Sequence, residues 1–210
     1  MITPREVGGD LQLLPLTRDY AARHAEMLTM MARDAIPHFD FQPSDLLATG
    51  ELPSGRIPET QPEYSAVLDN DGEPVGFVTA FERRGKDEPY TRDHVHIDAL
   101  VVDETYRSHP FESNPLHLGS LLLRECLSNA LAKPGYHTAG MQGRPDLFAL
   151  TAVAYDLRLW RFYYAHGFGQ SIESKLRTIR SVEDELPYPH ITMFSSREEA
   201  ELTVAGKHWH

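Results

Sequence analysis

The stretch at residues 107–123, RSHPFESNPLHLGSLLL, places a basic side chain and a glycine where a helix is expected to begin. It follows a strand-like run at residues 95–102. A helix N-terminus presents backbone N–H groups without partners and the positive end of the helix dipole, and both favour a bound anion. The sequence therefore predicts a phosphate-binding loop, with Arg107 either as a phosphate contact or as an ordinary surface arginine.

A second group of polar residues, His94, His96 and Asp98, alternates along an expected strand, so the three side chains share one face. An imidazole has an unperturbed pKa of ~6.5, which suits proton transfer near neutral pH. His96 and Asp98 could instead form a structural hydrogen-bonded pair. A His-x-His-x-Asp metal site is disfavoured because one strand holds its ligands too far apart for easy tetrahedral closure.

The turn Asp69-Asn70-Asp71-Gly72 is a strong local signal for a hairpin. These residue types tolerate the positive φ of a tight turn, so a hairpin is expected there. The turn superficially resembles a calcium loop, but it lacks the later bidentate Glu and lies between strands. Hydrophobic periodicity places strands at residues 11–16, 64–68, 74–81, 95–102 and 147–154, with two more near 170–179 and 190–195.

Helices are expected at about residues 17–33, 116–132 and 156–165, and Gly167 should stop the last of these. Residues 34–63 are punctuated by prolines and are interpreted as an irregular substrate-side insertion, and residues 197–210 as a C-terminal tail. The order of elements predicts an α/β fold with a mixed, mostly antiparallel central sheet flanked by helices. The sequence thus predicts a single domain over residues 1–210, with its core at about residues 10–196.

Composition narrows the classes of function. The net charge of −11 argues against a broad nucleic-acid footprint. An acidic surface would favour a cationic acceptor, although many proteins are acidic for solubility alone. We expect no membrane association, because apolar runs are short, and a cytoplasmic location, because there is no signal-like N-terminus. The only cysteine, Cys126, lies on an apolar helical stripe and is expected in the core.

Three segments resemble the GNAT family of N-acetyltransferases over roughly residues 10–196. LVVDETYR, residues 100–107, is similar to the strand that leads into the family's cofactor loop. LGSLLL, residues 118–123, is similar to the end of that loop and its helix, and FYYAHGF, residues 162–168, is similar to a helix that ends in Tyr and then Gly-Phe. The resemblance implies a GNAT-like acyl-CoA N-acyltransferase fold and transfer of an acetyl group from acetyl-CoA to an amine.

The resemblance also implies roles for individual residues. The pantetheine arm would lie along the backbone of Leu100, Val101 and Val102, with Asp156 where the family usually carries Asn. His96, aided by Asp98, would take the proton of the amine, and Tyr163 would protonate the leaving thiolate. Tyr164 would replace Tyr163 if the helix register differed, and both tyrosines could instead be core aromatics. No metal is implied.

The loop itself departs from the family's pattern. Arg107 and Gly119 are separated by residues 108–118, a longer spacing than in the family, and His117 stands where the first loop glycine is expected. In one account the extra residues bulge outward, and pyrophosphate still lies on amides near His117, Leu118, Gly119 and Ser120. In the other, Asn114 caps a helix that begins at Pro115.

We therefore expect acetyl transfer to a primary amine by direct transfer in a ternary complex. The acceptor would be a small molecule or a protein, with no nucleic acid, and a homodimer would be compatible with the resemblance. The alternative is a non-catalytic acyl-CoA-binding or regulatory protein that retains the fold.

Overall fold

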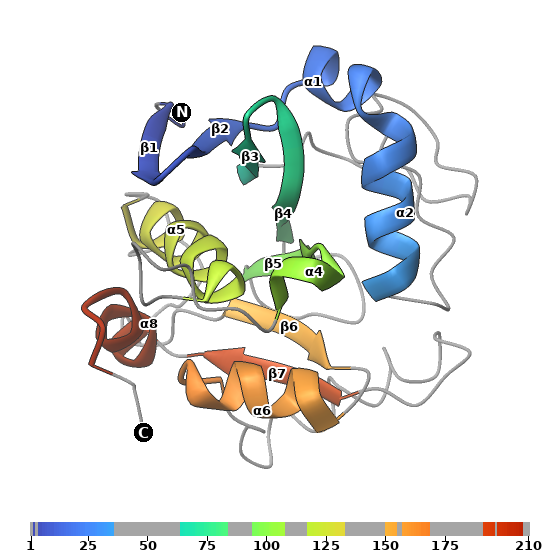
Figure 1. The fold of residues 1–210 in the computed structure, drawn as a ribbon. Helices are drawn as coiled ribbons and strands as arrows, with labels where there is room; N and C mark the ends of the chain where they lie inside the picture. Colours follow the sequence, from blue (N-terminus) through green and yellow to red (C-terminus); the bar gives the residue numbers. More distant parts are fainter. Residues whose placement is uncertain are drawn as a thin grey trace. The chain divides into compact units, whose positions relative to one another are not determined.

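The computed structural model describes residues 2, 4–35, 64–83, 94–107, 117–132, 150–154, 157–168, 191–195 and 197–207. The chain divides into two compact units, and its elements are shown in Figure 1. Unit 1 comprises Met1–Phe81 and Ala99–Cys126, and unit 2 comprises Glu82–Asp98 and Leu127–His210. Each unit is thus assembled from segments that are distant in the sequence, and the prediction of a single domain stays a prediction.

The sheet of unit 1 is antiparallel from β1 to β4. Strands β1 (Arg5–Gly8), β2 (Leu11–Pro15), β3 (Tyr64–Asn70) and β4 (Glu73–Arg83) are neighbours in that order. The end of β5 (His94–Val102) lies beside the start of β4, and the backbone N–H that follows it, at Asp103, donates to the Val75 carbonyl at 2.9 Å. Strand β1 was not predicted from the sequence.

The predicted hairpin between β3 and β4 is confirmed. Its two central residues, Asp71 and Gly72, have φ angles of 53° and 90°. Positive φ at both positions is the geometry of a type I′ turn, which matches the twist of the flanking strands. The Asp-Gly pair therefore sets the first pairs of β3 with β4, and a one-residue shift between Leu68 and Asp69 sets the register of the rest.

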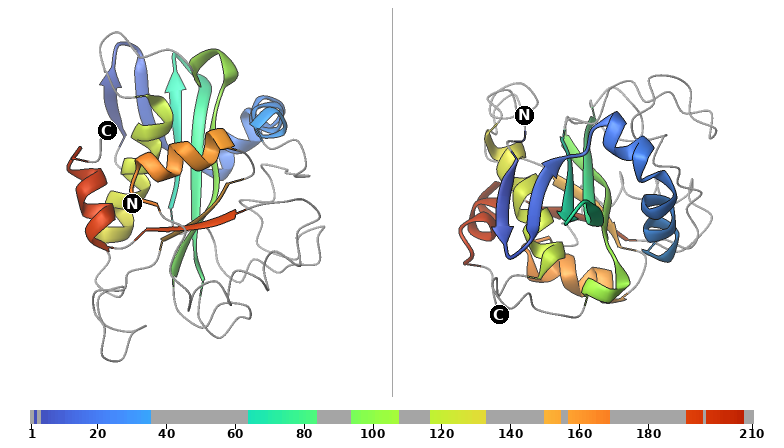
Figure 2. Two further views of the ribbon diagram at one scale, coloured as in Figure 1. Left: turned by 90° about the horizontal axis from the view of Figure 1, so that it is seen from below. Right: turned by 45° about the horizontal axis from the view of Figure 1, so that its top comes forward.

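Two helices cover one face of the unit 1 sheet, and α5 (Leu118–Ala132) covers the other (Figure 2). The predicted helix at residues 17–33 is divided at His24 into α1 (Arg18–Arg23) and α2 (Ala25–Ala35). Phe77 packs with α1 and α2, whereas a Cβ atom at Gly76 would lie 3.2 Å from Leu122 of α5. Successive strand residues face opposite sides of the sheet. Gly76 therefore faces α5, and Phe77 faces α1 and α2.

The sheet of unit 2 is mixed. Strand β6 (Leu150–Ala154) pairs in parallel with β5 at Val95 and His96, and in antiparallel along its whole length with β7 (Ile191–Ser195). Helix α6 (Leu157–Ala165) packs on β6 and β7 (Figure 1). The predicted mixed, mostly antiparallel sheet with flanking helices is therefore confirmed.

Helix α6 ends as the sequence predicts. Gly167 has a φ of 77°, and its N–H donates to the Tyr164 carbonyl at 3.1 Å. The Phe168 N–H donates to the Tyr163 carbonyl at 3.0 Å. These two bonds form a Schellman cap, whose left-handed residue is usually glycine because a Cβ is disfavoured there. The cap turns Phe168, which is 1% exposed, back into the core of unit 2.

The sequence predicted a tail at residues 197–210, but the structure forms helix α8 (Arg197–Val204) there. Ala200 and Thr203 are buried, and the Thr203 hydroxyl donates to the His166 carbonyl at 2.8 Å. The insertion was predicted to begin at residue 34, but residues 34 and 35 still belong to α2, so the prediction is wrong there. Residues 36–63, and the strand expected near residues 170–179, lie outside the described residues. Within the described part of the chain, no helix has both the length and the apolar character needed to cross a membrane.

Candidate functional site

The start of helix α5 lies where the sequence predicts an anion site. The His117 carbonyl accepts a hydrogen bond from the Leu121 N–H at 3.0 Å, so His117 is the N-cap and Leu118 is the first helical residue. The first N–H groups of an α-helix, here from Leu118 onward, have no acceptor inside the helix. Leu118 is buried, Gly119 is half-buried and Ser120 is 2% exposed, whereas the His117 side chain is exposed.

The helix start corrects two expectations. In the alternative account α5 would run on from Pro115 through His117, but α5 begins at Leu118 and His117 is not helical, whereas Asn114 and Pro115 themselves lie outside the described residues. The predicted start at residue 116 was two residues early for the same reason. The apolar side chains of Leu118, Leu121 and Leu122 are buried, and their burial fixes the first turn more strongly than the local Asn-Pro signal does.

Arg107 is the last residue of a one-turn helix, α4 (Glu104–Arg107), which follows β5. Its Nε donates to the Val102 carbonyl at 2.6 Å. Its Nη2 is buried and has no hydrogen-bond partner among the described residues. Buried polar groups are nearly always paired, and leaving a charged donor unpaired is destabilising. The Nη2 group is therefore suited to an acceptor from outside the described chain, and an anion is the matching chemistry.

The backbone that precedes Arg107 is closely packed. Leu100 is half-buried, and Val101 and Val102 are 1% and 7% exposed. A Cβ atom at Gly76 would lie 3.0 Å from the Val101 carbonyl oxygen, closer than such atoms normally approach. Glycine at position 76 thus lets β4 approach β5 just before α4, whereas a larger residue would require the neighbouring atoms to shift by a few tenths of an ångström.

The parallel ladder of unit 2 is short. Its pairs are Val95 with Leu150 and His96 with Thr151, although β6 continues to Ala154. Within the described residues of unit 2, the parallel pairing with β5 thus involves the first two residues of β6.

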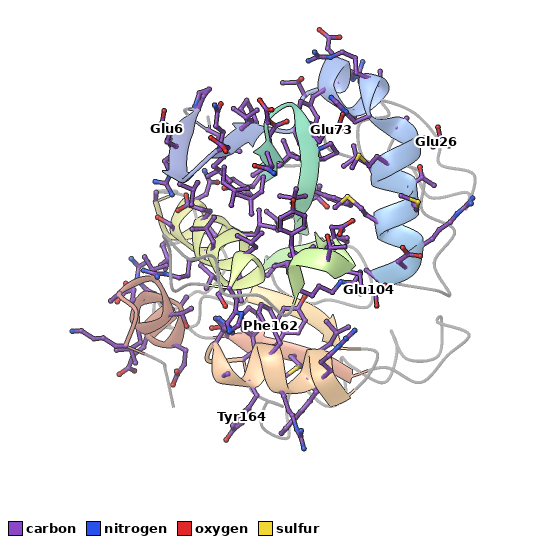
Figure 3. The ribbon with its side chains drawn as sticks, in the orientation of Figure 1. Glu6, Glu26, Glu73, Glu104, Phe162 and Tyr164 are labelled. Atoms are coloured by element: carbon purple, nitrogen blue, oxygen red, sulfur yellow. The ribbon has the colours of Figure 1, made fainter. Side chains whose placement is uncertain are left out.

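Tyr163 and Tyr164 have different environments on α6. Tyr163 is 5% exposed and its ring lies 5.3 Å from that of Phe168, whereas Tyr164 is 61% exposed and stacks on Trp160 at 5.1 Å. Phe162 and Tyr164 project from opposite sides of the helix (Figure 3). The register of α6 thus places Tyr163 inward, and the fallback assignment to Tyr164 loses its basis.

Several predicted site residues lie outside the described part of the chain. They are the side chains of His96 and Asp98 and the whole of Asp156. Residues 108–116, the extra length of the loop, lie outside it as well. In the part that the structure describes, no group of three His, Cys, Asp or Glu side chains is arranged to hold a metal ion.

A pocket of about 430 Å³ lies in unit 1 between the β3–β4 turn, α2 and α4. Carboxylates of Asp71, Glu73 and Asp103 line it together with Tyr106, and no lysine or arginine does. This charge disfavours a phosphate, so the pocket is not the anion site. The polar residues Asn70, Asp103 and Tyr106 were not predicted from the sequence to line a pocket. The Asp103-x-Thr105 pattern, a local helix-start signal, could have identified one of them.

Comparisons with known proteins identify the family and the fold. The model of the Acetyltransferase (GNAT) family matches residues 30–168, more than half of the chain. No curated protein matches the chain. Among solved structures, the chain is similar to Arabidopsis thaliana Naa50 in complex with the bisubstrate analogue CoA-Ac-MVNAL, with 14% identity and a TM-score of 0.51, covering 89% of this chain and 99% of that one.

Two further structures illustrate the range of likeness. An acetyltransferase from Thermus thermophilus is 15% identical with a TM-score of 0.51, over 90% of this chain and 97% of that one. A KacTA–DNA complex is 15% identical with a TM-score of 0.44, over 70% and 76% of the two chains. At these identities the likeness concerns the fold alone, and the expectation that this chain has no nucleic-acid partner stays a prediction.

Proposed function

Because the chain belongs to the acetyltransferase (GNAT) family, we propose that it binds acetyl-CoA and transfers the acetyl group to a primary amine. One observation carries the assignment of the cofactor site. The buried Nη2 of Arg107 has no partner among the described residues, and it belongs to the element that leads from β5 toward the N-terminus of α5. The CoA part of acetyl-CoA contains a pyrophosphate, and this is the anion that we assign to Arg107.

The residues present fit that ligand. Arg107 would donate from Nη2 to a phosphate oxygen while Nε remains bound to the Val102 carbonyl. Amides at Leu118, Gly119 and Ser120 would add the helix N-terminus, and His117 would lie at its edge. We assign the pantetheine arm to the backbone of Leu100, Val101 and Val102. That assignment rests on the resemblance of residues 100–107 to the strand that leads into the family's cofactor loop.

For the chemistry, acetyl-CoA supplies an activated thioester. His96, positioned by Asp98, would accept the proton of the attacking amine, so that a C–N bond can form as the C–S bond breaks. Tyr163 would donate its hydroxyl proton to the departing sulfur, and the burial of Tyr163 supports a role away from bulk water. Binding both substrates together would supply the positional part of the rate. Asp156 would contact the pantetheine arm.

Calorimetric titration with CoA tests the cofactor site. We expect binding by the wild-type protein and at least tenfold weaker binding by Arg107→Gln, which is about 1.4 kcal/mol. Arg33→Gln is a matched control, because Arg33 is an exposed arginine on α2 and the change in charge is identical. Absence of CoA binding by the wild-type protein at millimolar concentration would overturn both the cofactor and the enzyme assignment.

The acceptor class needs a separate measurement. Release of free thiol from acetyl-CoA is followed across a panel of small amines and peptides with free N-termini. We expect amine-dependent release with at least one class. CoA binding without thiol release from any amine would favour the second candidate, a non-catalytic acyl-CoA-binding protein, which the lengthened loop between Arg107 and Gly119 motivates.

A further inference from the structure

Helix α4 is too short to be stable by itself. It has four residues, and in an isolated helix of this length the hydrogen bonds do not offset the entropy lost in ordering the first turn. The direction in which it presents Arg107 must therefore be set by bonds to neighbouring elements. The described residues make such bonds at three places on α4.

The first two anchors are at the ends of α4. At its start, the Asp103 N–H donates to the Val75 carbonyl, and the Asp103 carboxylate accepts from the Thr105 N–H at 2.9 Å and from the Thr105 hydroxyl. At its end, Arg107 Nε is bound to the Val102 carbonyl. These bonds fix where α4 begins and ends, and α2 also lies against α4.

The third anchor joins α4 to the β3–β4 turn. The Asn70 side-chain amide donates to the Tyr106 hydroxyl at 3.3 Å. Asn70 lies immediately before the two turn residues with positive φ, and the neighbouring Asp69 holds the turn by accepting the Gly72 N–H at 2.8 Å. Asp69 is itself buried and accepts a hydrogen bond from the Tyr20 hydroxyl of α1. The amide of Asn70 is thus presented by a rigid support.

From these contacts we infer that Asn70 and Tyr106 are positioning residues that orient Arg107 toward the pyrophosphate of CoA through a hydrogen bond between the β3–β4 turn and α4. The inference rests on the proposed function, because it requires Arg107 to contact the phosphate. Neither residue touches the ligand in this scheme. Their effect should therefore be specific to the part of CoA that Arg107 binds.

The test compares the dissociation constants of CoA and of pantetheine, which lacks the pyrophosphate, by calorimetry. We expect Tyr106→Phe and Asn70→Ala each to weaken CoA binding about three- to tenfold, the range of one neutral hydrogen bond. Pantetheine binding should stay unchanged. Tyr164→Phe, the same change at an exposed tyrosine of α6, should leave both constants unchanged. Melting temperatures of the same samples show whether each variant is folded, and Tyr106→Phe carries the test if Asn70→Ala is not.

The effect of Tyr106→Phe on CoA affinity is also measured in the Arg107→Gln variant. If Tyr106 acts through Arg107, then Tyr106→Phe should change CoA affinity by less than about 1.5-fold when Arg107 is already replaced, because coupled residues are not additive. Full persistence of the effect in that background, or equal weakening of CoA and pantetheine, would overturn the inference. If Tyr106→Phe leaves the affinity for CoA unchanged while Arg107→Gln lowers it, the inference is overturned and the proposed function is not. Loss of all CoA binding by the wild-type protein would overturn both.

Discussion

The Tyr20 hydroxyl donates a hydrogen bond to the Asp69 carboxylate, and both residues are at most 6% exposed. The bond joins helix α1 to the end of β3, across 49 positions of sequence. Burial is the main reason that the pKa of Tyr20 is raised, and the hydrogen bond to Asp69 adds to it. The tyrosine therefore stays a proton donor throughout the physiological range.

Replacing this donor should destabilise unit 1. Tyr20→Phe removes a hydrogen bond that the Asp69 carboxylate accepts, keeps the one from the Gly72 N–H, and leaves part of a buried carboxylate unsatisfied. We expect the free energy of unfolding, measured by urea denaturation, to fall by about 1–3 kcal/mol. Tyr164→Phe, at an exposed position, should change it by less than about 0.5 kcal/mol. Equal effects of the two substitutions would show that the Asp69 contact contributes nothing.

Gly76→Ala should be destabilising for a steric reason. The new Cβ would lie 3.0 Å from the Val101 carbonyl oxygen and 3.2 Å from Leu122 Cδ1. The side chain of Leu122 can move, but the Val101 carbonyl is part of β5 and cannot. We expect a loss of about 1–3 kcal/mol in thermal denaturation. Gly76→Ala should cost about the same in a Leu122→Ala background as in the wild-type protein. A cost that disappears in that background would show that the clash is with Leu122 and that the carbonyl contact is unimportant.

Cys126 should be inert in the folded protein. It is 1% exposed, and burial raises the pKa of its thiol from 9.0 to about 12. A reagent that reacts with thiolates should label Cys126 only after unfolding. Rapid labelling of the native protein at about pH 8, close to the pKa of a free thiol, would contradict the core position.

The raised pKa of Cys126 also makes the free energy of unfolding depend on pH. The folded state holds the thiol proton more tightly than the unfolded state does. This difference contributes in full to the free energy of unfolding below pH 9, and the contribution is lost as pH rises toward 12. Tyr20 and Tyr64 also have raised pKa values because they are buried, and act in the same direction. The free energy of unfolding should therefore decline above pH 9. Alkaline denaturation followed by circular dichroism measures this decline, and a free energy that rises through this range would contradict it.

Thr203→Val should loosen the contact between α8 and the end of α6. The Thr203 hydroxyl donates to the His166 carbonyl at 2.8 Å, and both residues are buried. Valine has a similar shape but leaves that carbonyl without this donor, for a loss of about 1 kcal/mol. Thr29→Val is a control, because the Thr29 hydroxyl bonds the Ala25 carbonyl at an exposed site of α2. Equal losses in urea denaturation would rule out a special role for α8.

Tyr163→Phe separates catalysis from binding. If Tyr163 is the acid, its replacement should lower turnover by about 10²–10⁴-fold. The CoA dissociation constant should change little, because the ring and its packing remain. Steady-state kinetics and calorimetry on the same preparation measure the two effects. Unchanged turnover would remove Tyr163 from the acid role and leave it as a core aromatic beside Phe168.

Local chemistry made the β3–β4 hairpin and the end of α6 predictable, because Asp71, Gly72 and Gly167 supply the positive φ that these turns require. Helix α8 carried a local signal as well: Ser196 followed by Glu199 is a typical capping sequence. The break at His24 had no such signal, because the helical spacing continues through it. It is visible only in the structure, where the His24 N–H closes α1 and the His24 carbonyl opens α2.

The candidate site was predictable only in part. Arg107 and the α5 N-terminus follow from residue type and order along the chain. The Asn70–Tyr106 bond joins residues 36 positions apart, and such a pairing depends on how β4 and β5 lie together. The unpaired Nη2 of Arg107 likewise results from burial, which the hydropathy of a charged residue does not predict.

The brevity of α4 has a consequence for the strength of ligand binding. If α4 detached while the sheet beneath it stayed folded, Arg107 would be presented only during the fraction of time that α4 is docked. The apparent dissociation constant of a ligand bound by Arg107 would equal the intrinsic one divided by that fraction. Under the proposed function, a substitution that stabilises this one turn should therefore raise the affinity for CoA without adding any contact to it.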